Sequence, residues 1–192
     1  MTTGWAGGHA HGTERYQCLE LDPEMASYDA GSVNMRDTVF PNTVPFLREM
    51  GKAFLERKVL PEVEVFEAGH IDTALRLRDE GVLEGPLHFN LVLGVRGGAP
   101  GTIEQAVFML SMLPDDASWS ICGLGRTQLP LNVFGLIAGG HVRTGLEDNM
   151  NYARGELATN PQLVERIVRI AGEVGRPVAS PAEAREILSL PR

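Results

Sequence analysis

The chain has 192 residues, of which 43% are hydrophobic and 22% charged, and its formal net charge is −8. These values are typical of a globular protein with enough apolar material for a core, and the negative charge argues against a nucleic-acid-binding surface. No stretch is long and apolar enough to span a membrane, and no signal peptide is recognisable. Cys18 and Cys122 are too few and too far apart for a disulfide framework, so a cytoplasmic location is expected.

Strand-like and helix-like segments alternate from residue 25 onward. The predicted strand–helix pairs are 25–33 and 42–59, 61–69 and 71–81, 87–95 and 102–113, 118–125 and 126–140, and 141–146 and 161–176. Thr102 is expected to cap one helix, and a short closing helix over 180–190 is expected to begin with Ser180 as its N-cap and Pro181 at its first position. This alternation indicates an α/β protein with a parallel sheet covered by helices.

The polarity of the predicted strands favours a barrel over an open sheet with helices on both faces. In the second strand, Glu62 and Glu64 alternate with Val63 and Val65, and the later strands repeat this alternation. A doubly wound sheet requires strands that are apolar on both faces, whereas a barrel with a catalytic mouth can carry one polar face.

Five strand–helix units are fewer than the eight of a (β/α)8 TIM barrel, which usually needs about 250 residues. Residues 1–192 are therefore expected to form a single domain, the C-terminal portion of such a barrel, with about its last five units.

The segment "GGHVRTGLEDN" (139–149) concentrates candidate catalytic groups at the end of the last strand. Arg143 with Asp148 could position a base or stabilise an oxyanion, and Glu147 could bind a divalent metal. Alternatively, the acidic residues only cap the next helix. Glu64 lies on the presumed lumen face, where a carboxylate is costly unless it is paired, and Arg143 is an available partner.

Two glycine-containing segments are weaker candidates. The loop "GVRGGAPGT" (94–102) could hold a phosphate-bearing cofactor through Gly97, Gly98 and Arg96, or it is a plain flexible loop. His9 and His11 have the spacing of a metal pair on a strand, but the glycines around them indicate a loop, and we expect surface histidines there.

Six segments, in this order, resemble the β-keto acid cleavage enzyme family, whose members are also described as 3-keto-5-aminohexanoate cleavage proteins. The segments are "TTGWAGG", "PEMASYDAGSVNM", "EVEVFEAGH", "LHFNLVLGVRGG", "WSICGLGRTQLP" and "GGHVRTGLEDN…RGELATN". The resemblance implies a zinc-dependent (β/α)8 barrel that condenses a β-keto acid with acetyl-CoA and releases acetoacetate and a new acyl-CoA. It also implies a homo-oligomer.

The resemblance further implies roles for individual residues. Glu147 matches a zinc ligand, Arg143 and Asp148 match an activating dyad, and Glu64 matches the lumen glutamate of the fifth barrel strand. The residues that match substrate-contacting positions are Thr2, Thr3, Gly4, Ser27 and Asn34.

By the same comparison, the chain begins where the third strand of the family barrel ends, so it lacks the first three strands and the His-x-His zinc pair. By their order in the sequence, His9 and His11 do not match that pair. Two alternatives therefore stand beside the enzyme: a non-catalytic half-barrel that needs a partner chain, and another metal-dependent C–C lyase or aldolase on the same barrel.

Overall fold

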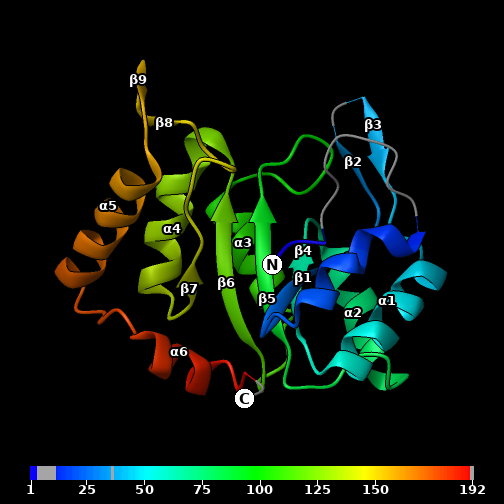
Figure 1. Ribbon diagram of the computed structural model, residues 1–192. Helices are drawn as coiled ribbons and strands as arrows, with labels where there is room; N and C mark the ends of the chain where they lie inside the picture. Colours follow the sequence, from blue (N-terminus) through cyan, green and yellow to red (C-terminus); the bar gives the residue numbers. More distant parts are fainter. Residues whose placement is uncertain (4–11, 36, 191–192) are drawn as a thin grey trace.

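A computed structural model of the chain describes residues 1–3, 12–35 and 37–190. Its centre is a five-stranded parallel sheet in the order β1-β4-β5-β6-β7 (Figure 1). The strands are β1 (Met25–Asp29), β4 (Leu60–Val65), β5 (His88–Leu93), β6 (Ser118–Gly123) and β7 (His141–Val142). The helices are α1 (Val44–Arg57), α2 (Ala68–Asp79), α3 (Ile103–Leu110), α4 (Gln128–Ile137), α5 (Asn160–Glu173) and α6 (Pro181–Ile187).

The hydrophobic core lies between one face of the sheet and the helices. Strand residues that alternate with the polar ones point into it, including the fully buried Val63, Phe89 and Ile121. Helix α4 approaches the sheet closely at Gly135, where a Cβ atom would lie 2.5 Å from the Ile121 side chain. The other face of the sheet carries the polar side chains, together with a smaller apolar cluster that includes Val92 and Cys122. This one-sided arrangement bears out the predicted polarity of the strands.

The chain start continues the sheet beyond β1. The amino group of Met1 donates to the carbonyl of Met25, and the Ser27 amide donates to the carbonyl of Met1, both at 2.9 Å. One residue bonded to two residues that are two apart is the pattern of a parallel ladder. Residues 1–3 therefore lie beside β1, where the end of a third barrel strand is expected.

The predicted helices and strands all form, and three capping predictions are confirmed. Thr102 accepts a hydrogen bond from the Gln105 amide, and Ser180 caps α6 in a reciprocal capping box with Pro181 at its start. The last strand is shorter than predicted, since β7 covers two residues, although the Arg143 amide still donates to the Ile121 carbonyl at 3.0 Å.

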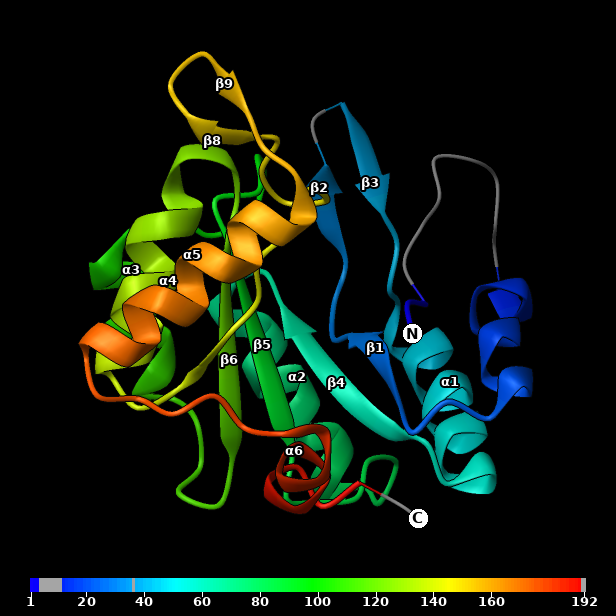
Figure 2. The same cartoon turned by 60° about the vertical axis from the view of Figure 1, so that its left-hand side comes forward.

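Several short elements escape the sequence prediction. The segment predicted as one strand over 25–33 divides into β1 and β2 (Val33–Met35), which pairs antiparallel with β3 (Thr38–Phe40). A second hairpin, β8 (Asn151–Ala153) with β9 (Glu156–Leu157), follows β7. The remaining elements are two 3-10 helical segments, η1 (Gly12–Leu21) and η2 (Gly125–Thr127). Figure 2 shows both hairpins standing beyond the ends of the parallel strands. Within the described residues, no helix is both long and apolar enough to cross a bilayer.

Candidate active site

A cavity of about 630 Å³ opens on the polar face of the sheet. Its polar lining is Thr2, Ser27, Asp29, Glu62, Glu64, Arg143, Glu147 and Asp148, and its apolar lining includes Phe40, Phe66, Val95 and Leu124. The strand register explains why these polar groups meet. Asp29, Glu64, Asn90, Ser120 and His141 are register partners on five successive strands. Parallel in-register strands therefore place one polar row across the whole sheet.

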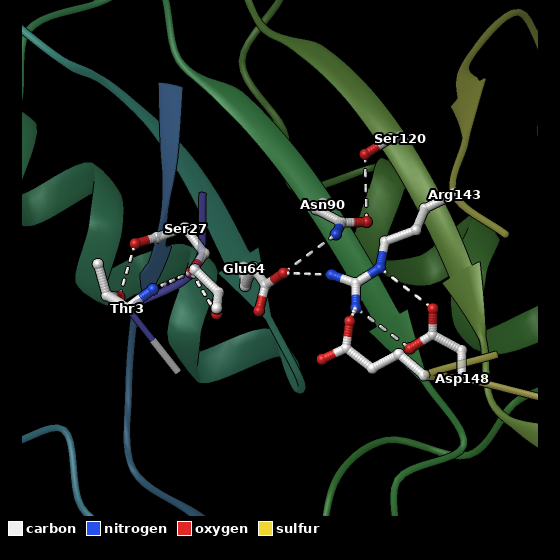
Figure 3. A network of polar contacts seen from close by, with 9 residues as sticks. Thr3, Ser27, Glu64, Asn90, Ser120, Arg143 and Asp148 are labelled. Carbon is white, nitrogen blue, oxygen red and sulfur yellow. Dashed lines mark hydrogen bonds and ion pairs between the residues drawn. The ribbon is translucent and has the colours of Figure 1, made fainter. Parts of the chain in front are cut away.

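Side chains in this row form a directed chain of hydrogen bonds (Figure 3). Ser120 Oγ donates to Asn90 Oδ1 at 3.1 Å, and Asn90 Nδ2 donates to Glu64 Oε1 at 3.4 Å. Asn90 is fully buried, and Ser120 is 5% exposed. Their hydrogen bonds satisfy polar atoms that would otherwise be costly to bury, and they fix the orientation of the Glu64 carboxyl group.

Arg143 joins three carboxyl groups (Figure 3). Its Nη1 lies 2.7 Å from Glu64 Oε1, and its Nη2 lies 2.8 Å from Glu147 Oε2. Asp148 is held by two bonds, from Nε at 3.1 Å and from Nη2 at 3.2 Å. The Asp148 side chain is 7% exposed and that of Glu147 is 78% exposed. The predicted cluster is therefore one network, with a buried inner part and one solvent-facing carboxylate.

The alternative of a helix cap for residues 147–149 is wrong. Helix α5 begins at Asn160, and Thr159 caps it through a capping box with Gln162. The backbone at Asp148 is instead fixed by the turn before it and by the loop after β6: its amide donates to the Gly145 carbonyl, and its carbonyl accepts from the Gly125 amide at 2.7 Å.

Asp29, which was not among the residues predicted from the sequence, completes the network. It is 2% exposed and is the register partner of Glu64, so the two carboxyl groups lie on neighbouring strands and interact electrostatically. Burial and, after it, the charge of Asp29 raise the pKa of Glu64 to about 8, against the opposing effect of Arg143. Burial also raises the pKa of Asp29. Two adjoining carboxyl groups cannot both ionise easily, so the pair retains a proton at neutral pH.

The period of two along "MASYD" could have revealed Asp29, because it places Asp29 on the same face as Ser27. No such signal marks its partner Arg15, which lies in η1. Arg15 Nη2 is 3.5 Å from Asp29 Oδ2, and its guanidinium carbon lies 4.5 Å from the ring centre of Phe40 and 4.7 Å from that of Phe46. Arg15 therefore supplies a positive charge beside Asp29, the member of the Asp29–Glu64 pair that Arg143 does not contact.

The predicted substrate-binding residues divide into two groups. Thr3 and Ser27 are locked together, since the Thr3 amide donates to Ser27 Oγ at 2.9 Å and Thr3 Oγ1 donates to the Ser27 carbonyl at 2.7 Å (Figure 3). Thr2 and Ser27 line the cavity. Asn34 is exposed on β2 and is not among the lining residues, and Gly4 lies outside the described residues.

The predicted cofactor loop packs against the first hairpin. A Cβ atom on Gly97 would lie 2.1 Å from the Asn34 carbonyl oxygen, and one on Gly98 would lie 2.8 Å from the Phe66 carbonyl oxygen. The amides of Gly94, Gly98 and Ala99 all donate to backbone carbonyls. Arg96 is exposed at the tip of the loop.

The residues described do not by themselves form a zinc site. Among them, no group of three His, Cys, Asp or Glu side chains is placed to hold a metal ion. Glu147 supplies one carboxylate, which pairs with Arg143. His9 and His11 lie outside the described residues. A zinc site usually needs three or four protein ligands, so one carboxylate is insufficient.

Comparison with known proteins identifies relatives of this chain. A family model described as beta-keto acid cleavage enzyme matches residues 1–190. A 3-keto-5-aminohexanoate cleavage enzyme of Fusobacterium nucleatum is 44% identical over 191 residues, which cover 98% of this chain and 69% of that enzyme. A 3-oxoadipate:acetyl-CoA acetyltransferase of Cupriavidus necator is 38% identical over 198 residues, which cover 100% of this chain and 68% of that protein.

The fold has a solved counterpart. The apo structure of ObcA superposes with a TM-score of 0.76 at 22% sequence identity, covering 98% of this chain and 50% of that chain. The chain therefore spans about half of that structure and about two thirds of the two relatives. The likeness bears out the prediction that this arc of strands and helices is part of a larger barrel-type fold.

Proposed function

Because the chain belongs to the β-keto acid cleavage enzyme family, we propose that it carries the catalytic face of an enzyme that cleaves a β-keto acid with acetyl-CoA. The products are acetoacetate, built from the acetyl group and the C1–C2 unit of the keto acid, and an acyl-CoA built from the remainder. The observation that carries this proposal is the Arg143 network, in which three carboxyl groups surround one guanidinium in a cavity of about 630 Å³. Small-molecule sites commonly have volumes of about 300–1,000 Å³.

The proposed reaction begins with removal of a proton from C2 of the keto acid. Asp148 is suited to accept that proton, because two bonds to Arg143 fix its orientation. The C2 carbanion attacks the thioester carbonyl carbon and releases CoA thiolate, which attacks C3. The C2–C3 bond then breaks, and C2 recovers a proton from Asp148.

Glu64 and Arg143 are proposed to stabilise charge during these steps. Negative charge develops on the carbonyl oxygens, and the Arg143 guanidinium and the proton of the Asp29–Glu64 pair are hydrogen-bond donors in the same cavity. Thr2, Thr3 and Ser27 are proposed to position the carboxylate and carbonyl of the keto acid. Gly4, which follows Thr3, and Asn34 are proposed as further substrate contacts on the resemblance alone.

Zinc and CoA contacts complete the proposal. When bound, zinc would polarise the keto oxygen. Glu147 is the one described residue proposed to contact zinc, so its other ligands must come from outside the described residues. Arg96, Gly97 and Gly98 remain candidates for CoA contacts because of the glycine-rich chemistry of their loop, the resemblance implies a homo-oligomer, and the two isolated cysteines favour a cytoplasmic location.

The decisive experiment follows a carbon label through the reaction. The protein, expressed at its full genomic length, is mixed with acetyl-CoA labelled in the acetyl group and with 3-keto-5-aminohexanoate, 3-oxoadipate or another β-keto acid. Mass spectrometry should find the label in acetoacetate and none in the new acyl-CoA. Turnover without acetyl-CoA would identify a simple lyase, and label in the acyl-CoA would exclude the proposed bond changes.

A further inference from the structure

A second large pocket, of about 680 Å³, lies outside the site described above. It is bounded by the loop after β6, helix α4, the β8–β9 hairpin and helix α5. In Figure 2 the hairpin stands above α5 and α4, at the end of the sheet toward which the parallel strands run. Three arginines line this pocket, Arg126, Arg154 and Arg166, and no described carboxyl group does. In a chain with a net charge of −8, such a local excess of positive charge needs an explanation.

Arg166 is the strongest sign that the pocket binds an anion. The residue is 8% exposed, and its Nε is buried without a hydrogen-bond partner. Its Nη1 donates to the Tyr152 carbonyl at 2.7 Å, and its guanidinium carbon lies 4.4 Å from the Tyr152 ring centre. Among the described residues it has no acidic partner. Burying a cation without a counter-charge is costly, so an anionic ligand would relieve the cost.

Arg126 and Arg154 are placed to extend the binding of such an anion. Both are exposed, and neither makes a side-chain hydrogen bond or an ion pair with another described residue. Arg126 lies in η2, directly after β6, and Arg154 lies in the turn between β8 and β9. The guanidinium group binds phosphate oxygens in a planar, two-bond geometry, and phosphate is the anion that such clusters most commonly recognise.

The position of the pocket supports the same ligand chemistry. In (β/α)8 barrels, the loops after the last two strands frequently bind phosphate at the C-terminal face of the sheet. The pocket uses the loops after β6 and β7, the last two strands of this sheet. It also adjoins the active-site cavity: Leu124 lines the cavity and Gly125 lines the pocket. Asn149, next to Asp148, lines the pocket as well.

We propose that the pocket formed by Arg126, Arg154 and Arg166 binds the phosphate groups at the nucleotide end of the CoA thioester. This inference rests on the proposed function, because that function requires a CoA ester whose reactive end lies in the neighbouring cavity. CoA carries a diphosphate and a ribose phosphate, separated from its thioester by a long flexible arm. A pocket for the phosphates beside a cavity for the thioester would therefore accommodate both ends of the CoA molecule.

The test compares two thioesters that differ in their phosphates. The double variant Arg126→Ala with Arg154→Ala is made in the protein at its full genomic length. Arg169→Ala is the control, since Arg169 is also exposed on α5 but does not line the pocket. The double variant should raise KM for acetyl-CoA at least tenfold with kcat nearly unchanged. It should leave KM for S-acetylpantetheine, which lacks phosphate, unchanged.

Several outcomes would overturn the proposal. One is an equal change with both thioesters, and another is an unchanged KM for acetyl-CoA. A third is that Arg96→Ala raises KM for acetyl-CoA while the double variant does not, because that result would assign the phosphates to the 94–99 loop.

Calorimetry separates failure of the pocket from failure of the proposed function. CoA should bind the unaltered protein at least tenfold more tightly than it binds the double variant, whether or not any β-keto acid is turned over. If turnover is present and CoA binds both proteins equally, the pocket proposal fails and the function stands. In a final titration, inorganic phosphate is added alone. Binding as tight as that of CoA would identify a site for free phosphate and overturn the assignment to CoA.

Discussion

The Nη1 atom of Arg143 lies 2.7 Å from Oε1 of Glu64, a residue 79 positions earlier in the chain. This ion pair connects the second strand of the sheet to the loop after the last one. It is also the centre of the proposed site, because the same guanidinium holds Asp148 by two bonds. Stability and catalysis are therefore expected to depend on the same side chain.

Replacing Arg143 tests this dependence. Arg143→Ala leaves the nearly buried Glu64 and Asp148 carboxyls without their cation, and we expect a loss of about 3 kcal/mol in the free energy of unfolding. Arg143→Lys keeps the charge but not the planar fork, so it should recover most of the stability and little of the turnover. Urea denaturation and the rate of acetoacetate formation measure the two effects. Equal recovery of both by lysine would contradict the proposed orienting role.

Asp29→Asn tests the acidic pair. The charge of Asp29 helps to raise the pKa of Glu64, so the neutral amide should lower the pH at which Glu64 ionises. If protonated Glu64 is required, the alkaline limb of the pH–kcat profile should move to lower pH. Ser120→Ala, two strands beyond Glu64 in the same row, removes no charge and serves as the control. An unchanged alkaline limb in Asp29→Asn would show that the pair does not set it.

The buried His88 predicts a loss of stability in acid. Burial, aided by His141, lowers the pKa of His88 to about 4, below its ordinary value of 6.5. Between pH 6.5 and 4 the unfolded chain binds a proton at His88 and the folded chain does not. The free energy of unfolding is therefore highest above pH 6.5, and this contribution is lost as the pH falls through 4. Over that range the loss should be about 3 kcal/mol. His88→Gln should unfold in urea with a correspondingly flatter dependence on pH, and an identical slope would refute the prediction.

Gly97→Ala tests the close contact between the glycine loop and the first hairpin. Gly97 has a φ of +107°, and an added Cβ would meet the Asn34 carbonyl oxygen at 2.1 Å. Gly155 is the matched control, because its φ of +79° is also positive but no atom lies within 4 Å of the added Cβ. Backbone strain in the left-handed region costs about 1 kcal/mol, so Gly155→Ala should lose about that amount and Gly97→Ala clearly more. Equal melting temperatures for the two variants would argue against the contact.

The sequence predicts the regular elements well, because their hydrophobic periods match the sheet and the helices that cover it. Glu64 and Arg143 were found by the same reasoning, since alternation along a strand fixes the face on which a side chain lies. The two hairpins cannot be predicted in this way, because strands of only two or three residues carry no measurable period. Arg15 could not be found from pattern at all: its ion pair with Asp29 and its stacking on Phe40 arise only in the folded chain.

The polar row from Asp29 to His141 also bears on how reliably the sheet assembles. If any of its strands paired one residue out of step, its carboxyl or amide side chain would turn toward the helices and an apolar side chain would face the lumen. Burying Glu64 or Asp29 among leucines and valines would cost several kcal/mol. The proposed catalytic groups therefore act as a check on strand pairing: incorrectly aligned chains are penalised by the same residues that give the correctly aligned chain its chemistry.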